Sequence, residues 1–182
     1  MTESALQWEQ LSETVVFDCP GFAVREDEVR LPDDTETTYH TVVESPAVVV
    51  LPFTPDDEVV TVAEWRQAVD RVNRGLPAGS VDPDDESVAA AARRELREET
   101  GHEADEVAVV GSVEPTNGLS DAVHHHVVAR GCTPTVEQEL DENESIRVER
   151  RSYDDLLAAA VDGDLRDGRA VLALLRHELT AR

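Results

Sequence analysis

The sequence predicts an α+β fold built around a mixed β-sheet. Short segments rich in valine and threonine recur along the 182-residue chain, and they predict strands. Segments with a helical pattern lie among them without a regular alternation, and this mixture favours α+β. The length fits one domain, or one domain with a small appendage, and a hydrophobic fraction of 40% is enough for a core.

The elements follow in order from turn residues and apolar runs. Pro20-Gly21 and Pro32-Asp33-Asp34 end or separate short strands near the N-terminus. The apolar run at 47–51 predicts a buried strand, and residues 75–85 form a loop dense in glycine, proline and aspartate. The expected strands are 13–18, 22–25, 28–31, 37–44, 47–51, 58–63, 107–113, 122–129 and 145–150, and the expected helices are 87–100, 153–161 and 170–179.

The helix at 87–100 is the most strongly marked element. It contains a run of alanines and no helix breaker, and Gly101 stands just past its end, where a C-cap glycine belongs. Val88, Ala92 and Leu96 form an apolar stripe along it. We therefore expect this helix to pack against a sheet.

The charge balance is extreme, with 40 acidic against 16 basic residues and a formal net charge of -24. Every one of those basic residues is arginine, and the acids are spread along the whole chain. Self-repulsion of this size destabilises a compact state unless salt screens it. We interpret the composition as adaptation to a salt-rich cytoplasm, such as that of a halophilic archaeon, rather than as an ordinary acidic protein. Nucleic-acid binding is not expected, because phosphate contacts need clustered cations.

The remaining bulk features predict a cytoplasmic protein. The N-terminal residues are polar and resemble no secretory signal, and no apolar run is long enough for a membrane span. Cys19 and Cys132 form no metal-ligand motif, so we expect two free thiols.

Three carboxylates share one face of the predicted helix. Glu95, Glu98 and Glu99 stand at positions i, i+3 and i+4, and their like charges repel. Such a set is either a solvated acidic face or a site for hard divalent cations, which prefer oxygen ligands and relieve the repulsion. The spacing alone leaves both alternatives open.

The residues around these carboxylates resemble the Nudix box, which reads G, five residues, E, seven residues, REU, one residue, EE, one residue, GU, with U aliphatic. The chain carries Leu76-Pro77-Ala78-Gly79, an acidic loop, Glu86, and then Arg94-Glu95-Leu96-Arg97-Glu98-Glu99-Thr100-Gly101. Seven residues separate Glu86 from Arg94, as the pattern requires. Two positions depart from it: six residues separate Gly79 from Glu86, and His102 takes the last aliphatic position. A chance match to so many fixed positions is improbable.

The resemblance extends more loosely to the ADP-ribose pyrophosphatase branch of that family. It rests on the N-terminal β-region, on Glu64-Trp65-Arg66, on Glu114-Pro115-Thr116-Asn117-Gly118-Leu119-Ser120-Asp121, and on Asp141-Glu142-Asn143-Glu144-Ser145-Ile146. It implies a Nudix fold, a mixed β-sheet sandwiched between helices, for residues 44–182. Residues 1–43 would form a small N-terminal β-domain that is exchanged between two copies in a homodimer.

The resemblance also implies the chemistry and its residues. The substrate would be a nucleoside diphosphate linked to another group, most simply ADP-ribose cut to AMP and ribose 5-phosphate, with Mg²⁺ or Mn²⁺ as cofactor. The expected metal ligands are the carbonyl of Ala78 with Glu95, Glu98, Glu99 and Glu144. Arg94 would orient Glu98, Glu142 would be the general base with Glu98 as the next candidate, and Arg66 would bind substrate phosphate.

Each of these assignments has an alternative. The acidic loop at 141–144 reads equally well as a solvated turn, and Arg66 as a member of a surface ion pair. His124-His125-His126 suggests a metal site, yet neighbours on a strand point to opposite faces, so a half-exposed strand is favoured. Other functions compatible with the box are a nucleotide-pool or dinucleotide polyphosphate hydrolase, and a non-catalytic nucleotide-binding sensor. The intact glutamate set argues against the sensor.

Overall fold

The computed structural model describes residues 3–180, which divide into two compact units that are treated separately here. The first unit is the chain up to Ser45 together with Glu114–Val123, and the second is Pro46–Val113 with the chain from His124 onward. The expected division at residues 43 and 44 leaves out Glu114–Val123, which groups with the N-terminal strands.

The first unit is an antiparallel sheet of order β1-β2-β3, formed by β1 (Glu9–Cys19), β2 (Phe22–Arg30) and β3 (Glu36–Val43) after a short 3₁₀ turn, η1 (Glu3–Leu6). The expected strands at 22–25 and 28–31 are wrong as separate elements, since β2 runs through both. Glu26 and Asp27, which lie between the two expected strands, pair with both β1 and β3. Asp27, for example, lies opposite Glu13 of β1 and Tyr39 of β3. The segment Glu114–Val123 joins this unit by backbone hydrogen bonds to Val42.

The second unit contains a mixed sheet and an antiparallel sheet. The mixed sheet has the order β7-β4-β10-β9, in which β4 (Ala47–Pro52) and β10 (His124–Arg130) are parallel, while β7 (Ala78–Ser80) and β9 (Glu106–Val113) pair antiparallel to their neighbours. The antiparallel sheet has the order β12-β5-β6, from β12 (Ile146–Ser152), β5 (Glu58–Arg66) and β6 (Arg71–Gly75). Two short pieces, β8 (His102–Glu103) and β11 (Thr133–Pro134), pair with each other, and η2 (Gln67–Val69) links β5 to β6.

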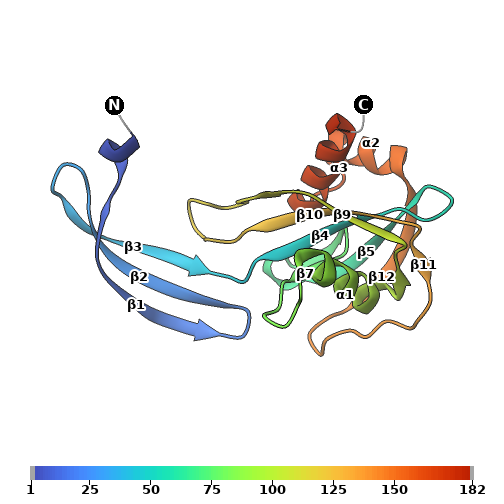
Figure 1. Ribbon diagram of the computed structural model, residues 1–182, viewed down its shortest axis with the longest axis horizontal. Coiled ribbons are helices and arrows are strands. Elements are labelled where there is room, and N and C mark those ends of the chain that lie inside the picture. The colour runs from blue at the N-terminus through green and yellow to red at the C-terminus, as the bar shows by residue number, and fades with distance from the viewer. Residues whose placement is uncertain (1–2, 181–182) are drawn as a thin grey trace. The chain divides into compact units, whose positions relative to one another are not determined.

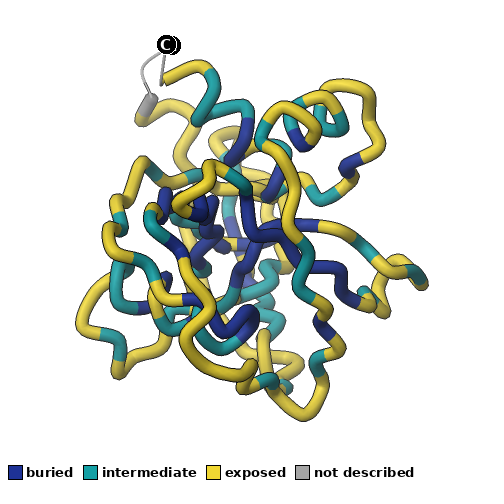
Figure 2. Tube along the Cα trace, turned by 90° about the vertical axis from the view of Figure 1, so that its right-hand side faces the viewer, coloured by how far each residue is buried: buried dark blue, intermediate teal, exposed yellow. Residues whose placement is uncertain are grey.

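Helices cover both faces of the mixed sheet, with α1 (Val88–Thr100) on one side and α2 (Tyr153–Asp162) and α3 (Gly168–Thr180) on the other (Figure 1). Side chains of β4 alternate between the layers, as a strand requires. Val48 and Val50 pack in the core beneath α1, whereas Val49 and Leu51 pack in the core beneath α2 and α3. Figure 2 shows the buried stretches of the chain in the interior, with exposed stretches around them. The α+β prediction is confirmed.

The loop expected at 75–85 is partly wrong, because it contains β7 and follows the unpredicted strand β6. Ala78 and Gly79 pair with Val49 and Val48 of the buried strand β4, so tertiary pairing imposes an extended backbone on a turn-rich sequence. This pairing brings the Leu76–Gly79 stretch of the box against the strand that α1 also covers.

The box helix begins and ends where the sequence predicts. The Ser87 hydroxyl accepts a hydrogen bond from the Ala90 N–H at 3.1 Å, and Gly101 ends the helix with a φ of 69° in the left-handed region. Ala92 and Leu96 are 1% exposed, which confirms the apolar stripe. In the described part of the chain, no helix is long and apolar enough to cross a membrane. Cys19 and Cys132 are free, as predicted.

Candidate active site

The side chains of the three box glutamates project from α1 on the side next to its apolar stripe. Glu95 and Glu99 are buried, at 8% and 3% exposure, while the Glu98 side chain is 33% exposed. The stripe of Ala92 and Leu96 fixes this orientation because it packs on β4 and turns the following positions toward β7 and β5. A solvated acidic face would expose all three carboxylates, so burial removes that alternative for Glu95 and Glu99.

The Ala78-Gly79 backbone forms a cradle for these two carboxylates. The Ala78 N–H donates a hydrogen bond to Glu99 Oε2 at 3.0 Å. The Glu95 carboxylate lies so close to Gly79 that a Cβ on residue 79 would come within 3.0 Å of its three terminal atoms. Glycine is therefore required at position 79 for this approach, although its own φ is ordinary. The carbonyl of Ala78, the expected ligand, belongs to the same stretch of backbone.

Arg94 links two of the box glutamates to the loop that follows β7. Its guanidinium donates to Glu95 Oε1 at 2.7 Å and to Glu98 Oε2 at 3.0 Å, the second being the i,i+4 contact expected from the spacing. It also donates to Asp85 through two bonds, of 2.9 and 3.2 Å, and to the Ser80 carbonyl at 2.8 Å. The Arg94 side chain thus orders two of the glutamates and the loop that follows β7.

The contacts of Arg94 explain why six residues, and not five, separate Gly79 from Glu86 in the box. Glu86 is exposed, whereas Asp85, one residue earlier, makes the bidentate pair with Arg94. Five residues separate Gly79 from Asp85, which is the spacing that the pattern asks of its first acid. The Arg94 hydrogen bonds hold the pKa of the Asp85 carboxyl below its usual range. Asp85 therefore takes the structural place that the sequence match gave to Glu86.

Burial disfavours the charged forms of both carboxylates. Burial raises the pKa of Glu95 to about 7, against the opposing effect of Arg94. Burial also raises the pKa of Glu99 to about 8, and the neighbouring Glu95, Glu144 and Glu64 add to the rise. A second positive charge at this position would stabilise the ionised forms, as a divalent cation does.

Two further charged pairs lie near these carboxylates. One is Glu64 and Arg66 of β5, and the other is Asp167 and Arg169 at the start of α3. Arg66 Nη2 lies 2.7 Å from Glu64 Oε2, so Arg66 does form an ion pair, and its partner Glu64 is only 8% exposed. Arg169 pairs with Asp167 at 2.9 Å and interacts electrostatically with Glu99 and Glu64. Although burial opposes ionisation, Arg169 and two backbone N–H groups keep the pKa of Asp167 below its usual value.

The segment before the acidic loop is fastened to the C-terminal end of α1. The last turn of a helix leaves carbonyls without helical partners. Here the N–H of Glu139 donates to the Glu98 carbonyl at 2.9 Å, the Gln138 side-chain amide donates to the Glu99 carbonyl at 2.5 Å, and the N–H of Thr135 donates to the Gly101 carbonyl at 2.9 Å. The chain then enters β12, where Ile146 pairs with Glu64. Residues 141–144 are thereby confined between α1 and the end of β5.

Within that loop the two candidate glutamates differ. Glu144 is partly buried and interacts electrostatically with Glu64, Glu95 and Glu99, so the structure brings it to the box glutamates. Its N–H donates to the Asp141 carbonyl and its carboxylate accepts from the Asp141 N–H, both at 3.0 Å, which closes a turn. Glu142 is exposed at the tip of the turn and makes no hydrogen bond or ion pair with any residue that the structure describes.

The donor set fits a hard divalent cation. All candidate donors are oxygens, two of the carboxylates are buried with raised pKa values, and Gly79 lets the Glu95 carboxylate lie against the backbone. Across residues 3–180, no group of three or more His, Cys, Asp and Glu side chains is arranged so that the group by itself could hold a metal ion. Mg²⁺ does not need one, since it is usually held by one or two carboxylates and completes its shell with waters and substrate phosphates.

The histidines serve packing. His124, His125 and His126 lie on β10, and His126 is 1% exposed with no hydrogen-bond partner for either ring nitrogen in the described structure. The predicted half-exposed strand is confirmed for His124 and His125, which are partly buried. His102, at the aliphatic position of the box, is buried, and its Nδ1 lies 2.8 Å from the Thr100 carbonyl.

Sequence reasoning missed Glu64, Asp85, Asp167 and Arg169 as site residues. Spacing from the glycine of the box could have found Asp85, because five residues separate it from Gly79. Asp167 and Arg169 stand far along the chain from the box, and only the packing of α3 brings them to Glu64 and Glu99. No local pattern signals that contact.

Comparison with known proteins matches the NUDIX domain family model to residues 43–173. A methanol dehydrogenase activator of Bacillus methanolicus is 29% identical over 150 residues, which is 81% of this chain and 80% of that protein. An ADP-ribose pyrophosphatase of Bacillus subtilis is 27% identical over 149 residues, with coverage of 81% and 80%. An ADP-ribose pyrophosphatase of Mycobacterium tuberculosis is 33% identical over 100 residues, 55% of this chain and 48% of that protein.

A solved structure supports the fold independently. The crystal structure of an ADP compounds hydrolase superposes with a TM-score of 0.83 and 24% sequence identity, covering 96% of this chain and 94% of that one. This likeness confirms the expected fold, a mixed sheet between helices with an N-terminal β-region.

Proposed function

Because the chain belongs to the Nudix family and is a Nudix pyrophosphatase, we propose that its substrate is ADP-ribose, which it hydrolyses to AMP and ribose 5-phosphate. The observation that carries the proposal is the pair of buried carboxylates, Glu95 and Glu99, held against the Ala78-Gly79 backbone beside two arginines. Such a site offers negative oxygens to a divalent cation and positive groups to a diphosphate. Two relatives bear the name ADP-ribose pyrophosphatase.

We assign Mg²⁺ or Mn²⁺ to the cradle. Glu95, Glu99 and the Ala78 carbonyl would be its main ligands, with Glu98 and Glu144 in support. When bound, the cation neutralises the diphosphate and lowers the pKa of the attacking water. Arg94 keeps Glu95 and Glu98 in place by the hydrogen bonds described above.

The reaction adds water to one phosphorus and breaks the bridging P–O bond, so that one product keeps each phosphate. Glu142 is the proposed general base, which takes the proton of the attacking water. Its exposure at the tip of an anchored turn lets it reach over a bound diphosphate without being buried beforehand. Glu98 is the next candidate for the base, since it is partly exposed beside the cradle.

Arg66 is the proposed phosphate ligand. Its guanidinium is 37% exposed and uses one nitrogen on Glu64, which leaves further N–H groups for a phosphate. Arg169, fixed by Asp167 near Glu99, supplies a second positive charge on the other side of Glu64. Together they offset the negative charge of an approaching diphosphate.

We propose that the protein acts as a homodimer in which residues 1–43 form an exchanged β-domain. The strands of the first unit leave apolar side chains uncovered, among them Val15 at 60%, Phe17 at 52% and Phe22 at 41% exposure. An exposed apolar area on a small sheet marks a protein-interaction surface. A second copy of the chain would cover it.

The acidic composition supports a protein of a salt-rich cytoplasm. Arginines form ion pairs with some of the acidic residues, but 40 acidic residues far outnumber the 16 arginines. Most of the acidic side chains must therefore be stabilised by water and by screening from dissolved salt.

The test is turnover of a substrate panel with and without Mg²⁺ or Mn²⁺, at a salt concentration that keeps the protein folded. ADP-ribose should be the best substrate, ahead of a nucleoside diphosphate sugar, a dinucleotide polyphosphate and a nucleoside triphosphate. AMP and ribose 5-phosphate should form in equal amounts, and reaction in oxygen-18 water should show by mass which phosphorus is attacked. Faster turnover of the dinucleotide polyphosphate or of the nucleoside triphosphate would indicate the second candidate, a nucleotide-pool or dinucleotide polyphosphate hydrolase. Binding without turnover would indicate a sensor.

A further inference from the structure

A cavity of about 260 Å³ lies beneath α2 and α3 in the second unit. Its apolar lining comes from the residue that follows β6, from α2, from the loop before α3 and from α3 itself. These residues are Leu76, Leu156, Ala159, Leu165 and Leu174. Thr61 of β5 contributes to the wall, and Arg74, Arg151 and Asp164 are the charged members of the lining.

The cavity opens on the face of β5 opposite to the acidic cluster. Alternate residues of a strand face opposite sides, so Val59 and Thr61 share one face and Val62 and Glu64 the other. Val59 packs in the same core as Leu156 and Leu174, beneath α2 and α3. Glu64 instead interacts with Arg66 and with the carboxylates around Glu99. The cavity therefore lies on the face of β5 opposite to Glu64, although Gly75 in its lining borders Asp167.

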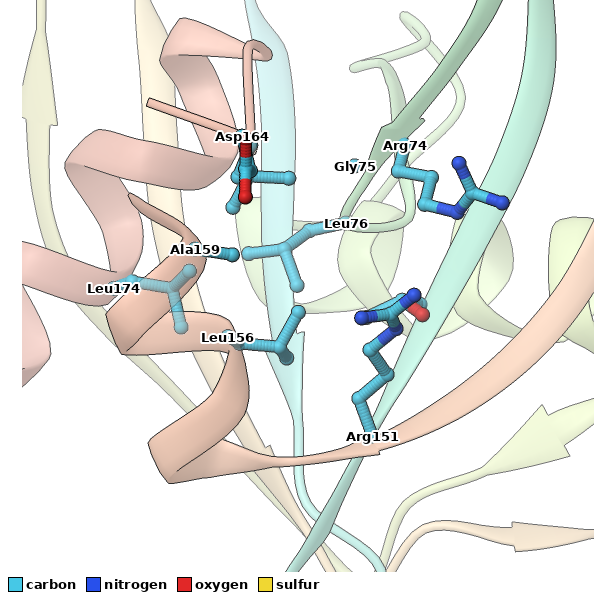
Figure 3. A pocket seen from close by; sticks show the side chains of 10 residues that line it. Arg74, Gly75, Leu76, Arg151, Leu156, Ala159, Asp164 and Leu174 are labelled. Carbon is cyan, nitrogen blue, oxygen red and sulfur yellow. The ribbon is translucent and has the colours of Figure 1, made fainter. Parts of the chain in front are cut away.

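Two arginines stand on the side of the cavity opposite the leucines, where Arg151 reaches toward the cavity and the Arg74 guanidinium points away from the leucines (Figure 3). Arg74 uses its Nε on Glu149 at 3.1 Å, which leaves its terminal nitrogens free to bind another group. The Arg151 side chain makes no ion pair or hydrogen bond with any residue between 3 and 180, while its backbone pairs with Val59 of β5. The electrostatics of this wall favour an anion.

The geometry points to a second ligand site here, for a small organic monoanion with an apolar body. The anionic group would lie between Arg74 and Arg151, where guanidinium groups bind a carboxylate in a bidentate way. The apolar body would lie against Leu156 and Leu174. The volume is below the range of sites that bury drug-sized ligands, so ADP-ribose is too large. The Asp164 carboxylate in the lining disfavours a second negative group.

The experiment is a titration of the full-length protein with benzoate at fixed KCl, followed by calorimetry and by methyl NMR of the leucines. Benzoate should bind saturably and shift the methyl signals of Leu156 and Leu174. Benzamide, which has the same shape without the charge, should bind about tenfold more weakly or worse, because it loses charge-assisted hydrogen bonds. Inorganic phosphate, which has charge without an apolar body, should not shift the leucine methyls.

Matched arginine variants locate the site. Arg151→Gln should weaken benzoate binding by about tenfold or more. Arg150→Gln, one residue earlier and on the opposite face of β12, should leave it unchanged. Both residues are exposed, so both variants should fold. Glu99→Gln should bind benzoate like the wild type, which separates this site from the proposed active site.

Three results would overturn the inference. One is an absence of saturable benzoate binding, and another is equal binding of benzamide and benzoate. The third is an Arg151→Gln protein that binds benzoate as tightly as the Arg150→Gln protein does.

Discussion

Replacing Gly79 by alanine tests the cradle with a single methyl group. The added Cβ would come within 3.0 Å of the terminal atoms of Glu95, while ordinary contacts begin near 3.4 Å. The backbone of residue 79 does not need a positive φ, so alanine itself causes no strain there. The atoms in the way are the end of a flexible side chain, and they can move. The structure therefore predicts that the chain folds and that the Glu95 carboxylate is displaced.

The size of the effect follows from that displacement. Restoring an ordinary contact requires the carboxylate to withdraw by about 1 Å, and an error of that size in a catalytic group can cost about a hundredfold in rate. The stability loss should be small, about 1 kcal/mol for the weakened hydrogen bond between Arg94 and Glu95, or roughly 2–4 °C in melting temperature. We thus expect kcat/KM for ADP-ribose to fall by about a hundredfold, with weaker Mn²⁺ binding and a nearly unchanged melting temperature.

The matched control is Gly118→Ala, since a Cβ there meets nothing within 4 Å and the glycine has no positive φ. It should keep wild-type turnover. The measurements are steady-state kinetics, Mn²⁺ titration and thermal unfolding of all three proteins side by side. Wild-type turnover and metal affinity in Gly79→Ala would refute the reasoning, because the Glu95 carboxylate at Gly79 could then not be a metal ligand.

Three further predictions follow from the box, the acidic loop and the net charge. Asp85→Asn should lower turnover by about tenfold, because Arg94 loses a bidentate partner. Glu86→Gln should leave turnover unchanged. Equal effects of the two variants in kinetic assays would contradict the assignment of Asp85 as the first acid of the box. Glu142→Gln should reduce kcat by about a hundred- to ten-thousand-fold with metal affinity little changed, whereas Glu144→Gln should weaken Mn²⁺ binding; full turnover in Glu142→Gln would give the base role to the box helix. The melting temperature of the wild type should rise steeply from dilute to molar KCl, and a flat profile would contradict the halophilic interpretation.

Much of the fold could be predicted because its signals are local. The helix at 87–100 carries its own cap residues and apolar stripe, and the run at 47–51 can only be a buried element. The strands β6 and β7 escaped prediction for the opposite reason. Arg71–Gly75 has few apolar residues, and Ala78–Ser80 lies in a turn-rich stretch, so both become strands only by pairing with β5 and β4.

The candidate site divides in the same way. The shared face of the α1 glutamates and the contact of Glu98 with Arg94 follow from helical spacing within one element, and the structure has that contact as expected. Glu64 and Arg169 join the cluster through the placement of β5 and of the first residues of α3, across long stretches of sequence. The burial that raises the pKa of Glu99 depends on β7, which pairing alone creates. Periodicity carries no information about such contacts.

The central claim, that Glu95 and Glu99 hold a divalent cation for diphosphate hydrolysis, is tested most directly by Glu99→Gln. The amide oxygen of glutamine can still accept the Ala78 N–H, and the change removes a charge that burial disfavours, so the fold should persist. Mn²⁺ binding would be measured by electron paramagnetic resonance beside turnover of ADP-ribose on the same samples. The account predicts a folded protein that binds Mn²⁺ at least about tenfold more weakly and loses most of its turnover, as expected when a direct ligand is removed. Wild-type Mn²⁺ affinity together with wild-type turnover in Glu99→Gln would contradict it.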